Sequence, residues 1–156
     1  MFLDLENNMR YFFIILSTLF ITANAQEYKA VFNCNAKDMQ YVASRMILVE
    51  RTIDMIEKNG GRTKFAVTIH GSCAPIVSKN YDEIILDEDD LASIEISQKQ
   101  LIKLSERGVE LVVCAMSLNA NTIPKEDVIP EVKISPNSFI ETIGYQNSGY
   151  ALMVFE

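Results

Sequence analysis

Apolar residues follow two different spacings along the chain, and the alternation of these spacings predicts the order of strands and helices. Continuous apolar runs of strand length lie at residues 28–34, 64–71, 109–114 and 150–155, and a shorter extended piece lies at 131–135. Between the first two runs, apolar residues recur every three or four positions, as on one face of an α-helix: Met39, Val42, Met46, Val49, Ile53 and Ile56. A strand, a long helix and a strand in succession form a unit with parallel strands.

Capping residues predict where the later helices begin and end. Ser97 and Gln100 match a capping box, which predicts a helix that starts at Ser97 and stops at Gly108. Residues 135–136, Ser-Pro, predict a last helix with proline at its first position, ended by the Asn-Ser-Gly of residues 147–149. The third apolar run is continuous, as in a parallel strand covered on both faces. We therefore expect one α/β domain: a mainly parallel sheet of about five strands with helices on both faces.

An acidic run separates the second predicted strand from the helix predicted to start at Ser97. Residues 82–90, DEIILDEDD, include six carboxylates. The pattern favours a solvated loop or a short edge segment. A calcium loop is the alternative, but the spaced D-x-D-x-D-G pattern of such loops is missing.

The first 25 residues have the pattern of a secretory signal peptide. Arg10 precedes the apolar run of residues 11–25, which ends in Ala-Asn-Ala at 23–25. An uncleaved anchor helix is the alternative, although the run is short for a membrane span of roughly 20 residues. We expect cleavage before Gln26, a mature domain of residues 26–156 with no stable membrane span, and a periplasmic or secreted location.

Composition and charge exclude several function classes. The chain is 49% hydrophobic and 22% charged, with a net charge of −7, and removing Asp4, Glu6 and Arg10 with the leader takes this to −6. Nucleic acid is not expected as a partner because phosphate binding requires a basic face. The sequence has no G-x-G-x-x-G, no Walker loop and no G-x-S-x-G, so no nucleotide cofactor or serine nucleophile is predicted.

Three cysteines and the single histidine fall at the ends of predicted strands. Cys34 ends the first strand, His70 ends the second with Cys73 just beyond, and Cys114 ends the third in LVVCAMSL. The carboxyl ends of parallel strands line the ligand crevice of open α/β sheets. Four interpretations remain open: buried core cysteines, a disulfide such as Cys34 with Cys73, a zinc or copper site, and a nucleophilic thiol at Cys114. No metal is predicted, because there is no C-x-x-C pair.

Four segments together resemble the DsrE/DsrF-like family, the sulfur-relay superfamily that includes TusD and YchN types. They are VTIHG at 67–71, LIKLSERGVELVVCAMSL at 101–118, IPKEDVIPEVKI at 123–134 and YQNSGYALM at 145–153. The likeness covers residues 28–155. It implies a three-layer α/β/α sandwich of the flavodoxin-like or Rossmann-like type and assembly into homo-oligomers, often trimers or hexamers.

The resemblance also implies a role for Cys114. Sulfur-relay members accept sulfur as a persulfide on a cysteine at this position and pass it on. The sequence departs from the relay pattern in residues 116–121, which lack arginine, and in its export signal, because relay members are cytoplasmic. Both departures argue against the cytoplasmic partners of the family.

The leading hypothesis is an exported sulfur carrier, or sulfurtransferase-like protein, with an unidentified sulfur donor and acceptor. Cys114 would hold the persulfide, His70 would tune the thiol, and Cys34 or Cys73 would resolve the persulfide. The remaining binding candidates at this edge are Gly71, Ser117 and Asn119. The alternative is a non-enzymatic oligomeric protein that binds a small ligand or a metal at the same edge.

Overall fold

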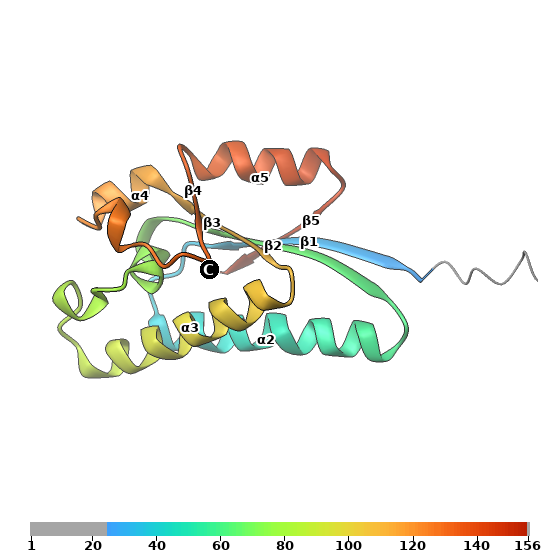
Figure 1. Cartoon of the computed structure of the whole chain (residues 1–156), viewed down its shortest axis with the longest axis horizontal. Coiled ribbons are helices and arrows are strands. Elements are labelled where there is room, and N and C mark those ends of the chain that lie inside the picture. Colours follow the sequence, from blue (N-terminus) through green and yellow to red (C-terminus); the bar gives the residue numbers. More distant parts are fainter. Residues whose placement is uncertain (1–24, 156) are drawn as a thin grey trace, which may run out of the picture.

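The computed structural model describes residues 25–155 as alternating strands and helices, shown in Figure 1. The predicted signal peptide, apart from Ala25, lies outside these residues. The elements follow in this order: β1 (Glu27–Cys34), α2 (Met39–Lys58), β2 (Arg62–Ile69), η1 (Gly71–Val77), η2 (Tyr81–Glu83), α3 (Glu88–Glu106), β3 (Glu110–Cys114), α4 (Ala115–Ala120), η3 (Lys125–Asp127), β4 (Lys133–Ser135), α5 (Ser138–Asn147) and β5 (Ala151–Phe155).

The five strands form one parallel sheet in the order β4-β3-β2-β1-β5. Helices α2 and α3 lie on one face of this sheet and α5 lies on the other, which gives the three layers of Figure 1. The α/β fold of the flavodoxin-like or Rossmann-like type is thereby confirmed. No helix in the described part of the chain is both long and apolar enough to cross a membrane.

The main core lies between the sheet and the pair α2 and α3. The stripe predicted for α2 is confirmed, because Met39, Val42, Met46, Val49 and Ile53 are all buried there. Full burial of each such side chain contributes about 1.5–3 kcal/mol to folding before conformational entropy is subtracted. Helix α5 differs, because Ser138 is its only buried residue.

The predicted capping box at Ser97 is wrong. Helix α3 begins at Glu88, nine residues earlier, and Ser97 lies in its interior, where its hydroxyl donates to the Ser93 carbonyl at 2.9 Å. The true N-cap is Asp87, whose carboxylate accepts from the amides of Asp89 and Asp90. A capping-box sequence inside a longer amphipathic stripe does not start a helix, because the upstream turn is already stabilised by its own cap.

The acidic run therefore contains a helix start as well as a loop. Glu88, Asp89 and Asp90 occupy the first turn of α3, where the positive end of the helix dipole stabilises carboxylates. The last helix also begins later than predicted. Asn137 is its N-cap and accepts from the Phe139 amide, so Pro136 lies before the helix and not at its first position.

Candidate functional site

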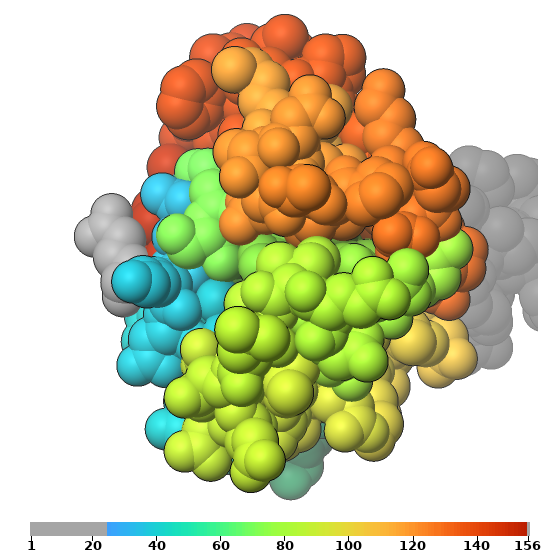
Figure 2. Space-filling view, turned by 90° about the vertical axis from the view of Figure 1, so that its left-hand side faces the viewer, coloured from blue at the N-terminus to red at the C-terminus, as the bar shows by residue number. Residues whose placement is uncertain are grey.

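The chemistry-bearing side chains gather where β1, β2 and β3 end. These strands are adjacent, and their register pairs Cys34 with Ile69 and Ile69 with Val113. Cys114 follows at the next position of β3. His70 is the first residue after β2, because β2 ends at Ile69 and not at Gly71 as predicted, and Gly71 begins η1. Figure 2 views this end of the molecule, where the segments around residues 71–95 (green to yellow-green) and 115–132 (orange) lie side by side.

The cysteines point to opposite faces of the sheet. Residues paired across parallel strands share a face, and consecutive residues alternate. Cys34, Ile69 and Val113 therefore face α2 and α3, whereas Cys114 faces α5. The three cysteines lie at one end of the sheet, as predicted, but they form two separate groups.

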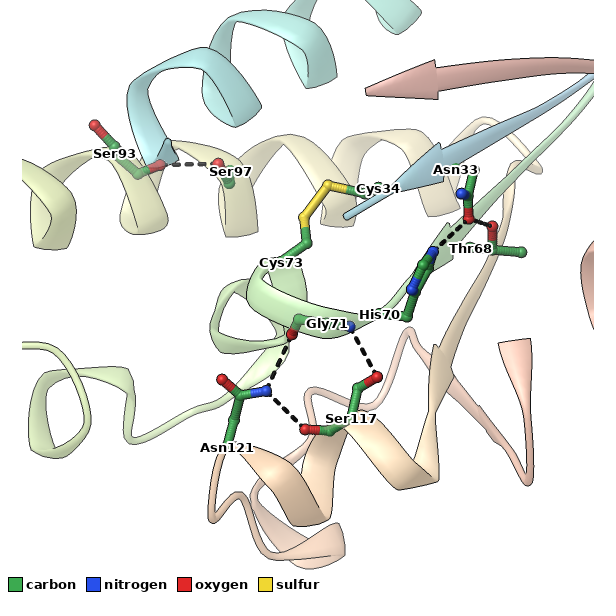
Figure 3. The surroundings of a disulfide bond; sticks show 10 residues. All are labelled: Asn33, Cys34, Thr68, His70, Gly71, Cys73, Ser93, Ser97, Ser117 and Asn121. Carbon is green, nitrogen blue, oxygen red and sulfur yellow. Dashed lines mark hydrogen bonds between the residues drawn. A yellow bond between two sulfur atoms is a disulfide. The ribbon is translucent and has the colours of Figure 1, made fainter. Parts of the chain in front are cut away.

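Cys34 and Cys73 form a disulfide that joins the end of β1 to η1 (Figure 3). Their Cα atoms are 5.9 Å apart and both residues are fully buried. The disulfide interpretation is therefore the one that the structure shows for this pair. In this state neither cysteine has a thiol with which to resolve a persulfide on Cys114.

Cys114 is the free cysteine of the described chain and is only 4% exposed. It is also the N-cap of α4. Burial raises the pKa of its thiol, but the backbone amides of Ser138, Ser117 and Met116 and the Ser117 hydroxyl all hydrogen-bond the sulfur and lower it. The net result is a pKa below the ordinary thiol value, so a larger fraction of Cys114 is thiolate at a given pH than for an ordinary cysteine.

The Ser117 hydroxyl connects Cys114 to the segment that follows β2. It accepts a hydrogen bond from the Gly71 amide at 2.8 Å, which leaves its own proton free to point at the Cys114 sulfur. The Asn121 side-chain amide holds the same junction, donating to the carbonyls of Gly71 at 3.0 Å and Ser117 at 2.8 Å (Figure 3).

Only glycine fits at position 71. Its φ is +55°, in the left-handed region that side chains rarely adopt. A Cβ atom there would also lie 1.9 Å from Oδ1 of Asn35. The backbone at Gly71 lies close to Asn35 in the loop between β1 and α2, and in this position its amide donates to the Ser117 hydroxyl.

His70 lies in a polar cluster on the same face of the sheet as Cys114. Its Nε2 is 2.9 Å from Oδ1 of Asn33, which also accepts from the Thr68 hydroxyl at 2.9 Å (Figure 3). Because an amide oxygen only accepts, Nε2 carries the proton and Nδ1 holds the free lone pair of the neutral ring. The ring of Phe139 packs edge-on against it, with centroids 6.3 Å apart.

Burial lowers the pKa of His70 below its ordinary value. The neutral form of the ring therefore predominates at pH 7, so His70 supplies little positive charge to Cys114 at neutral pH. Stabilisation of a Cys114 thiolate comes instead from backbone amides and from Ser117.

Some of the predicted binding residues lie beside Cys114 and others do not. Gly71 and Ser117 contact each other beside Cys114, whereas Asn119 is exposed on α4. Sequence reasoning missed the parts played by Asn33 and Ser138. Asn33 could have been found from its place one residue before the end of β1, but no local signal brings Ser138 to Cys114.

Acidic and metal-binding side chains do not converge here. Among residues 25–155, no three His, Cys, Asp or Glu side chains are grouped so that they could hold a metal ion. The amides and the Ser117 hydroxyl that lower the pKa of Cys114 are hydrogen-bond donors, which suit an anionic sulfur.

The sequence of this chain is similar to a protein family and to a protein of another organism. The sequence model of the DsrE/DsrF-like family matches residues 9–155. An uncharacterized protein of Aquifex aeolicus (strain VF5) is 33% identical over 148 residues, which cover 94% of this chain and 64% of that protein. The chain thus spans less than two thirds of the length of this relative.

Two solved structures are similar to this chain at low sequence identity, and the first of them shares its fold. A protein of unknown function from Methanobacterium thermoautotrophicum, MTH1491, superposes with a TM-score of 0.64 at 16% identity, covering 82% of this chain and 99% of that one. The ychN protein from E. coli aligns with a TM-score of 0.49 at 11% identity, covering 84% of this chain and 99% of that one.

Proposed function

Because this chain belongs to the DsrE/DsrF-like family, which suggests a sulfur-relay role, we propose that it carries sulfane sulfur as a persulfide on Cys114. The observation that supports this most directly is the set of donors around the sulfur: the amides of Met116, Ser117 and Ser138 and the Ser117 hydroxyl. These donors come from the starts of α4 and α5. A structural core cysteine needs no such donors.

The loading step requires a thiolate and a sulfane donor. With thiosulfate as donor, the Cys114 thiolate attacks the outer sulfur, a new S–S bond forms, and the bond to the sulfonate sulfur breaks. Sulfite leaves with the electron pair of that bond, so one thiolate and one thiosulfate give one persulfide anion and one sulfite. The lowered pKa of Cys114 raises the fraction of attacking thiolate at neutral pH.

Burial of Cys114 limits access to its sulfur. At 4% exposure, competing thiols and oxidants reach it rarely, and a sulfur donor has to enter by the same route. The buried Cys34–Cys73 disulfide keeps the other two cysteines from attacking the persulfide. His70 stays a neutral neighbour in this proposal, with its Nε2 held by Asn33.

Mass spectrometry of the intact protein tests the proposal. After incubation with thiosulfate or polysulfide, wild type is expected to gain sulfur-atom masses that reductant removes, and Cys114→Ser is expected to gain none. The variant Ser72→Ala, which changes an exposed hydroxyl of η1, is the matched control and should load like wild type. Equal loading of wild type and Cys114→Ser would refute the assignment.

The proposal also includes export of the protein and its assembly into a homo-oligomer. The apolar run that ends in Ala-Asn-Ala supports cleavage before Gln26 and a periplasmic or secreted location. Helix α5 supports a homo-oligomer, because its side chains Phe139, Ile140 and Ile143 are 66%, 62% and 57% exposed. Contiguous apolar side chains of this kind mark interfaces between subunits.

A further inference from the structure

An elongated groove runs along α2 on the face of the sheet opposite to Cys114. It encloses a volume of about 350 Å³, within the usual range of small-molecule sites. Ala30, Phe32, Phe65 and Met153 from three neighbouring strands form its floor. The groove exists because α2 and α3 cover β1, β2 and β3 but leave the edge strand β5 uncovered on this face.

The wall of the groove is one stripe of α2. The lining residues recur at helical spacing from Tyr41 to Ile56, over a length of about 22 Å at 1.5 Å per residue. Most of them are apolar, including Leu48 and Val49. The shape suits a linear apolar chain better than a compact ring system.

Arg45 is the exception in this apolar wall. Its Nε is buried and has no hydrogen-bond partner. Its guanidinium carbon lies 4.5 Å from the centroid of the Tyr41 ring, which positions the group without neutralising its charge. Within the described residues no carboxylate pairs with Arg45, whereas Arg107, the C-cap of α3, binds Asp54 and Glu57.

Arg45 and Lys29 are the two charged residues that line the groove, and no Asp or Glu lines it, in a chain whose net charge is −7. Lys29 is paired with Glu27 at 3.6 Å, so the charge available to a ligand is that of Arg45. A buried donor without a partner carries a free-energy penalty that a bound acceptor would remove. A planar guanidinium is suited to a carboxylate, which it can hold through two parallel hydrogen bonds.

From this geometry we infer that the groove binds a linear aliphatic carboxylate, with the carboxylate on Arg45 and the alkyl chain along α2. The methylene chain lies against Phe65 and against Leu48 and Met153, which are 46% and 49% exposed and lose contact with water. This site is independent of sulfur transfer, because Cys114 lies on the other face of the sheet. It therefore stands or falls separately from the proposed function.

The test titrates the purified full chain with decanoate and follows the methyl signals of its methionines by NMR. We expect the Met153 signal to shift with saturation, while the signal of Met116, on α4 and 64% exposed, stays in place. Octanoate should bind roughly 15-fold more weakly than decanoate, at about 0.8 kcal/mol for each of the two missing methylenes.

Matched variants separate the charge from the apolar groove. Arg45→Gln should weaken decanoate binding about 10- to 100-fold, the range for a hydrogen bond to a charged group, and should leave the binding of neutral decanol unchanged. Arg51→Gln, which alters an exposed arginine two positions after Val49 on α2, is the control and should bind decanoate like wild type. Circular dichroism of each variant confirms that the fold is retained.

Three outcomes would overturn the inference. Decanoate that binds wild type and Arg45→Gln equally would show that Arg45 does not hold the carboxylate. A Met153 signal that stays fixed would show that the groove is not the site. A Met153 signal that changes on dilution of the protein alone would show that a second copy of the chain occupies the groove.

Discussion

Reduction of the Cys34–Cys73 disulfide should destabilise the protein by about 4 kcal/mol. The bond joins residues 39 positions apart and is fully buried. In the chain-entropy description, closing a loop of this length removes about 13 cal/mol/K from the unfolded ensemble, or about 4 kcal/mol at 25 °C. This is a large part of the 5–15 kcal/mol by which a typical domain is stable.

Urea unfolding of oxidised and reduced protein measures this effect. With a slope of about 2 kcal/mol per M, the midpoint should fall by about 2 M on reduction. The comparison is made in a Cys114→Ser background, so that the free thiol does not exchange with the disulfide. Because the link acts on the unfolded chain, the native circular dichroism spectrum should remain the same.

The double variant Cys34→Ala with Cys73→Ala provides the control. It should unfold at the lower urea concentration and should not respond to reductant. Coincident midpoints for oxidised and reduced protein would refute the reasoning, because they would mean that the covalent link does not restrain the unfolded chain.

Four further predictions concern the sulfur site, the leader and the assembly. Ser117→Ala should raise the pKa of Cys114, so that the midpoint of the pH dependence of its alkylation moves to higher pH. Gly71→Ala should destabilise the fold by about 1–3 kcal/mol, measured by thermal unfolding, because φ is +55° there. Protein recovered after export should begin at Gln26 by N-terminal sequencing, and an N-terminus at Met1 would contradict the leader. Ile140→Glu should give a monomer by light scattering where wild type is an oligomer, and a wild-type monomer at micromolar concentration would contradict the interface.

Local patterns in the sequence were sufficient for the strands and for the longest helix. The stripe from Met39 to Ile53 predicts α2, because a helix that packs on a sheet buries one face and therefore carries apolar residues at every third or fourth position. The continuous run before Cys114 predicts a doubly covered parallel strand for the same reason. The start of α3 at Glu88 could not be read in this way, because a loop and a helical first turn rich in acids look alike in sequence.

Strand ends follow from apolar runs, so the sequence alone could assign Cys34, His70 and Cys114 to one end of a parallel sheet. The side of the sheet that each side chain faces could be seen only in the folded protein. That depends on register, which pairs Cys34 with Ile69 and sets Cys114 on the opposite face. The donors on the Cys114 sulfur also depend on the packing of α5, whose first residue, Ser138, is 24 positions away in the chain. Contacts of this kind follow from the closing of the fold around its core, and no local pattern of residues specifies them.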